Sequence, residues 1–131
     1  MSDCAPKNLC CWFEIPVTDL SKSIEFYNYV LETEITEQPF GEGDCQMMMG
    51  FFPMGDEGYG AAGALIKNDY MQPSDKGTLV YMSTSDIEAA LARANEKGGQ
   101  TIAPKMAIGE HGFIGIFSDL DGNRVGVHCM S

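Results

Sequence analysis

The sequence predicts an α+β domain built from two tandem β-α-β-β-β modules, whose strands form a cupped, barrel-like mixed sheet with the helices on its outside. Three features predict this: an internal repeat, an amphipathic helix at the same place in each copy, and short strand-like runs after each helix. The repeat has an offset of 67 residues, since residues 12–20 (WFEIPVTDL) match residues 79–87 (LVYMSTSDI). Two such copies account for the 131 residues as a single domain, 1–131.

The first module is expected over about residues 9–67. A short strand from Trp12 leads to Asp19, whose carboxylate can cap the free N–H groups of a helix. Apolar residues then recur at helical spacing, which predicts a helix with one buried face. Three strands are predicted after it, at residues 34–38, 44–51 and 60–67, with a longer turn at 53–58. The apolar stripe of the helix consists of Leu20, Ile24, Tyr27, Val30 and Leu31.

Residues 68–76 contain Pro73 and are predicted to link this module to a second one at about 77–130. The second helix has Ser85 and Glu88 at the spacing of a capping box, and Gly98-Gly99 is typical of a helix end. Its apolar stripe is Ile87, Leu91 and Ala94. Strands are predicted at residues 100–103, 112–117 and 124–129, with a tight turn at 121–123 between the last two.

Strand alternation separates an apolar face from a mixed one. Phe13, Ile15 and Val17 share one side of the first strand, and we expect this side to pack on the helices. The opposite sides carry side chains of another kind, which predict one polar, concave surface with Glu14, Tyr81 and His128 as candidate catalytic residues. The residues on these opposite sides are Trp12 and Glu14, Leu79 and Tyr81, and Gly126 and His128.

The composition excludes several classes of partner. The formal net charge is −11, from 8 Lys and Arg against 19 Asp and Glu, so binding to nucleic acid or to an anionic membrane is not expected. No apolar run approaches the roughly 20 residues of a membrane span. The five cysteines include no C-x-x-C pair and no export signal precedes them, which indicates reduced thiols in the cytoplasm.

Three segments carry a family resemblance: residues 12–27, residues 77–90, and the ending at 116–126 (IFSDLDGNRVG). Together they resemble the vicinal oxygen chelate (glyoxalase/bleomycin-resistance/dioxygenase) superfamily, and in particular the branch described as related to lactoylglutathione lyase. The resemblance implies a ligand cavity inside the paired modules, a small-molecule ligand and a homodimer. It also implies a divalent metal, held by His, Gln or Glu from the first and last strands of each module.

The sequence departs from that metal-binding pattern. The positions that match the family's ligands are Trp12, Leu79 and Gly126, none of which can hold a metal. We therefore expect no metal cofactor at the usual place. A shifted divalent-metal site at Glu14 and His128, with Tyr81 as a third ligand, stays open as an alternative. So do a hydrogen-bonded network of these three residues and a metal-free reaction with His128 as base and Glu14 orienting it.

Two functions from different classes remain open. One is a lyase or isomerase of glyoxalase type that acts on a small oxygenated metabolite, and the other is a metal-independent small-molecule binding or resistance protein. A ligand-sensing domain is a third reading. Asp119 and Asp121 are interpreted as turn residues. The residues expected to contact the ligand are Trp12, Leu79, His111, Met48 and Phe113.

Overall fold

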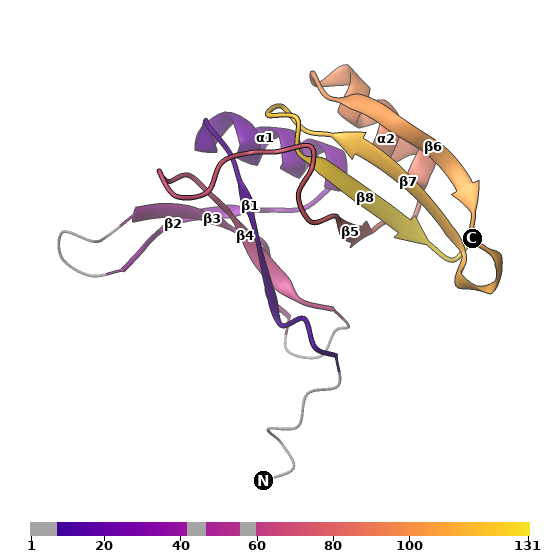
Figure 1. Cartoon of the computed structure of the whole chain (residues 1–131), viewed down its shortest axis with the longest axis horizontal. Helices are drawn as coiled ribbons and strands as arrows, with labels where there is room; N and C mark the ends of the chain where they lie inside the picture. The colour runs from indigo at the N-terminus through magenta and orange to yellow at the C-terminus, as the bar shows by residue number, and fades with distance from the viewer. Residues whose placement is uncertain (1–7, 42–46, 56–59) are drawn as a thin grey trace, which may run out of the picture.

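The computed structural model describes residues 8–41, 47–55 and 60–131 (Figure 1). The first module contains β1 (Trp12–Pro16), α1 (Leu20–Leu31), β2 (Thr36–Phe40), β3 (Met47–Phe51) and β4 (Ala62–Ile66). The second contains β5 (Val80–Ser83), α2 (Ile87–Glu96), β6 (Gln100–Ala107), the 3-10 turn η3 (Gly109–His111), β7 (Phe113–Ser118) and β8 (Arg124–Cys129). The predicted order of elements is thus confirmed. Residues 44–46 of the predicted 44–51 strand and 56–58 of the predicted turn lie outside the described residues.

Each module forms its own four-stranded mixed sheet. The first sheet has the order β1-β4-β3-β2 and the second has the order β5-β8-β7-β6. In each, the first and last strands of the module pair in parallel and the other pairs are antiparallel. The predicted α+β fold of two β-α-β-β-β modules is confirmed. Within the described residues its strands form two four-stranded sheets, which diverge in Figure 1 and do not close into a barrel. Among the described strands, β1 and β5 each keep one unpaired edge.

The helix-facing sides of both sheets bury into one core. Phe117 of the second sheet contacts the rings of Phe26 and Tyr27 on α1, with centroids 6.0 and 6.3 Å apart, so the helix of the first module also packs on the second sheet. The predicted apolar face of β1 takes part through Ile15, and that of β8 takes part through Val125. One core therefore holds both modules together.

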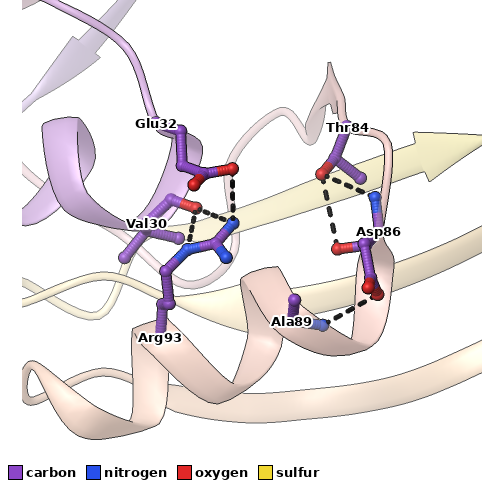
Figure 2. Close-up of polar contacts among 6 residues, drawn as sticks. All are labelled: Val30, Glu32, Thr84, Asp86, Ala89 and Arg93. Carbon is purple, nitrogen blue, oxygen red and sulfur yellow. Dashed lines mark hydrogen bonds and ion pairs between the residues drawn. The ribbon is translucent and has the colours of Figure 1, made fainter.

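Both helices begin at a carboxylate cap. The Asp19 side chain accepts a hydrogen bond from the Lys22 amide, as predicted. In the second helix the prediction was one residue early: Asp86, not Ser85, is the N-cap, and it accepts from the Ala89 amide at 3.0 Å (Figure 2). Asp86 has the extended backbone that an N-cap requires, and its own N–H is bonded to the Thr84 hydroxyl.

Arg93 of α2 ties the two helices together at the end of α1. Its Nε and Nη2 atoms donate to the Val30 carbonyl at 3.1 and 2.9 Å, and Nη2 lies 3.6 Å from the Glu32 carboxylate (Figure 2). The last carbonyls of a helix lack partners within the helix, and a cation there is favourable. The contact therefore gives the Val30 carbonyl a hydrogen-bond partner and fixes the position of α1 on α2.

A buried polar cluster joins the two modules near Pro16, where β1 ends. The Tyr27 hydroxyl donates to the Asp119 carboxylate at 2.6 Å, and the Asn123 side chain donates to the Pro16 carbonyl at 2.8 Å. Burial, and then the nearby carboxylate of Asp119, raise the pKa of the Tyr27 phenol well above its usual range. The phenol therefore keeps its proton, and the two aspartates that were expected in the turn act as structural groups, since Asp121 accepts from Thr18.

Candidate ligand-binding site

The strand register defines the face of the first sheet that points away from the helices, which we call its open face. A side chain at Gly50 would meet Ile24 and Ile35, so Gly50 faces the helix. By alternation Met49 and Phe51 point to the open face, where their partners along the sheet also lie. The open face is formed by Trp12, Glu14, Pro16, Thr36, Gln38, Phe40, Met47, Met49, Phe51, Ala62, Ala64 and Ile66.

A cavity of about 390 Å³ lies between the unpaired edge of β1 and the start of β5 and β8. A volume of this size suits a small organic molecule. The lining is mainly apolar, with a few polar groups from the linker and the strand ends. We call it the junction cavity; it is lined by Cys10, Trp12, Phe13, Glu14, Ile15, Pro16, Met71, Gln72, Ser74, Gly77, Thr78, Val80, Asn123, Arg124 and Val125.

Trp12 and Glu14 belong to both the cavity and the open face. The indole N–H of Trp12 donates to Glu14 Oε2 at 3.2 Å, which orients both side chains along β1. Both are accessible, and 37% of the Trp12 surface is exposed. A bound molecule in the cavity could thus contact an aromatic ring and a carboxylate at once.

The three candidate catalytic residues do not form the expected hydrogen-bonded network. Glu14 is paired with Trp12, whereas His128 Nε2 lies 2.7 Å from the His111 carbonyl and donates to it. The Tyr81 ring covers Gly126, its partner across β5 and β8. No hydrogen bond or ion pair joins Glu14, Tyr81 and His128, all of which are among the described residues, and only Glu14 lines the junction cavity.

The expected ligand contacts are likewise divided. Trp12 lines the cavity, and His111 lies in the exposed turn η3, where its carbonyl holds His128. Met48 points to the helix side of β3, because it alternates with Met47 and Met49, so it lies away from the open face. Phe113 packs against the core beside Lys105, on the same side of β7 as the buried Phe117. Leu79 precedes β5 and is partly exposed, outside the cavity lining.

Several lining residues were not predicted. Met71, Gln72 and Ser74 come from the linker, which folds over the cavity, and Ser74 is held there because its amide donates to Asn123. Arg124 lines the cavity at the start of β8. The sequence identified residues 68–76 only as a linker. Its local sequence does not indicate that it packs over β1, so its contribution to the cavity could not be predicted.

Comparisons with known proteins agree with this architecture. The model of the Glyoxalase/Bleomycin resistance protein/Dioxygenase superfamily matches residues 11–127. The chain belongs to this superfamily. No curated protein matches it. The matched residues span both modules. No helix among the described residues is long and apolar enough to cross a membrane.

Several solved structures share the fold of this chain. A glyoxalase/bleomycin resistance protein from Streptomyces sp. CB03234 is 25% identical, with 91% of this chain and 98% of that chain covered and a TM-score of 0.65. TnmS3, an antibiotic binding protein from the same organism, is 24% identical. The match covers 97% of this chain and 100% of that chain, with a TM-score of 0.66. A glyoxalase I mutant from Zea mays is 21% identical. The match covers 90% of this chain and 45% of that chain, with a TM-score of 0.67.

The side chains at the superfamily's metal positions do not fit a metal ion. A β-carbon at Gly126 would lie 2.9 Å from Tyr81 Cγ and closer still to Cδ1, so a glutamate there would displace the ring. On β4 the partners of Trp12 and Glu14 are Ala62 and Ala64, which have no donor atom. Among the described residues, no three His, Cys, Asp or Glu side chains are grouped to bind a metal.

Proposed function

We propose that this protein binds a small, largely apolar molecule in the junction cavity without a metal ion. The observation that carries the proposal is the cavity itself, about 390 Å³ in volume, with aromatic and aliphatic walls and a few polar groups. Such a composition is typical of ligand pockets, in which apolar walls supply affinity and a few polar groups fix orientation. The likeness in fold to an antibiotic binding protein is consistent with a binding role.

Filling the cavity tests the proposal. Thr78 is exposed at the cavity wall, so Thr78→Phe should occupy the space that a ligand needs. N-phenyl-1-naphthylamine, a neutral probe that fluoresces in apolar surroundings, should bind the native protein saturably at one site. We expect Thr78→Phe to weaken that binding at least tenfold, measured by fluorescence titration, and treatment with a chelator to leave it unchanged.

Ser21→Phe is the matched control, because it adds the same ring at an exposed position of α1 away from the cavity. It should bind the probe as the native protein does. Equal binding by the native protein and Thr78→Phe would place the probe elsewhere and refute the proposal. A loss of probe binding on chelation would refute its metal-independent part.

We also propose that the protein acts in the cytoplasm as a homodimer. The described cysteines Cys10, Cys11 and Cys129 are free thiols, which suits a reducing compartment. The second sheet leaves large apolar side chains accessible, among them Met106 at 50% and Tyr81 at 44% exposure. Apolar surface of this kind is commonly covered by a second copy in twofold dimers.

A second candidate function is proton transfer in a lyase or isomerase reaction. His128 favours it, because Nε2 donates to the His111 carbonyl and this leaves Nδ1 free to accept a proton. If the protein is such an enzyme, His128→Ala should reduce kcat at least a hundredfold on its substrate. The variant Glu14→Gln, measured in the same assay, shows whether Glu14 also takes part in the proton transfer. Full activity in both variants would exclude these residues from the chemistry.

A further inference from the structure

An aromatic row crosses the open face of the first sheet. Its members are Trp12, Phe51 and Phe40, with ring centroids 6.2 Å apart for Trp12–Phe51 and 6.3 Å apart for Phe51–Phe40. Phe40 is 58% exposed and Trp12 is 37% exposed, so the row is accessible at both ends. Met47 lies on the same face beside it and is half-buried, so its thioether adds polarizable surface, whereas Met49 is buried beneath the row. The row begins at Trp12, which also lines the junction cavity.

The charge beside this row is negative. Glu14 is exposed on the same face. The Trp12 indole N–H bonds only to its Oε2 atom, which leaves Oε1 available to a ligand. The open face contains no Lys or Arg within its four described strands. In the junction cavity the single cation among the described lining residues is Arg124, and its Nη2 atom already lies 3.6 Å from the Asp75 carboxylate.

We propose that the ligand of this site is a planar aromatic molecule with a positively charged group. The proposal rests on the proposed binding function and adds the chemical class of the ligand. The flat part stacks on Trp12 and extends toward Phe51, where offset or tilted ring contacts are favourable. The cationic group lies over the indole face and beside Glu14 Oε1, so that it gains a cation–π contact and a charge-assisted contact together.

The indole and the carboxylate reinforce one another in this arrangement. The hydrogen bond from Trp12 to Glu14 keeps the carboxylate at the edge of the ring and leaves the ring face free. A cation on that face therefore meets the negative ring surface and the carboxylate from one position. An anionic ligand would meet the same carboxylate with no described cation on the open face to offset the repulsion, which makes the site selective for positive charge.

Three aromatic probes of similar size separate charge from shape: N-methylquinolinium as the cation, 1-methylnaphthalene as the neutral form and 1-naphthoate as the anion. Binding is measured by equilibrium dialysis at low salt and by emission of Trp12, the only tryptophan of the chain. We expect N-methylquinolinium to bind at least tenfold tighter than 1-naphthoate and to change the Trp12 emission saturably. Glu14→Gln should weaken the cation about fivefold and leave 1-methylnaphthalene unchanged.

Glu37→Gln is the matched control, since Glu37 is also exposed on this sheet but points to the helix side of β2, opposite Gly50. It should not affect any probe. Equal weakening of the cation by both variants, equal affinity for cation and anion, or no saturable binding of the cation would each overturn the proposal. Loss of 1-methylnaphthalene binding in Thr78→Phe would still support the junction cavity as a site, so failure of the charge selectivity is distinguishable from failure of the binding function.

Discussion

Asp119→Ala should lower the free energy of unfolding by about 3–5 kcal/mol, because four donors lose a buried acceptor together. The carboxylate accepts from the Tyr27 hydroxyl at 2.6 Å, from the Asp121 and Asn123 amides at 2.9 and 3.0 Å, and from Asn123 Nδ2 at 2.9 Å. Only 4% of Asp119 is exposed, so water does not readily replace it. Urea unfolding followed by circular dichroism measures the change.

Asp69→Ala is the control for this change, because Asp69 is exposed and makes no side-chain hydrogen bond within the described chain. It should change the free energy of unfolding by less than about 0.5 kcal/mol. Asp119→Asn should fall between the two, since an amide keeps one acceptor oxygen but meets two of the donors with its own N–H group. A loss below 1 kcal/mol for Asp119→Ala would show that the cluster is not what holds the modules together.

Gly63→Ala should lower the free energy of unfolding by about 3 kcal/mol and displace β1. The added β-carbon would lie 2.6 Å from Phe13 Cδ2 and closer still to the Phe13 carbonyl oxygen. A carbonyl cannot move away without moving its strand, and Gly63 is paired directly with Phe13 in the parallel ladder. Because Trp12 and Glu14 lie on that strand, the emission of Trp12 should change as well, and probe binding should weaken.

The same substitution at Gly77 provides the comparison. At Gly77 the added β-carbon meets no described atom within 4 Å, and the backbone there is not left-handed. Gly77→Ala should therefore be neutral or slightly stabilising, by less than about 1 kcal/mol. If both alanine variants unfold at the same urea concentration, the contact between Gly63 and β1 is not a tight one.

The repeat made the architecture predictable. Paired segments such as those around Asp19 and Asp86 have the same pattern of a strand, a carboxylate and an amphipathic helix, and this pattern depends only on local sequence. The joining of the halves was not predictable in the same way. The bond between Tyr27 and Asp119 spans 92 residues of sequence, and each residue has an ordinary local role, in a helix stripe and in a turn.

The site was predicted less well because it depends on register. Met47, Met48 and Met49 are identical in kind, so the alternation of β3 cannot be read from them, and only the pairing with β2 shows that Met48 faces the helix. Likewise, the aromatic row needs Phe40 and Phe51 to be aligned across two strands. The same-face position of Trp12 and Glu14 was predictable, since both lie on one strand with period two.

The shared core has an evolutionary consequence. Since α1 packs on the second sheet through Tyr27 and Phe117, the inward side chains of the two repeats constrain one another and must change in concert. The exposed outward residues are under no such restraint, and Tyr81 or Met106 can be exchanged without rebuilding the interior. A duplicated scaffold of this kind can acquire new specificities by mutation of its outer surfaces while its folding stays intact.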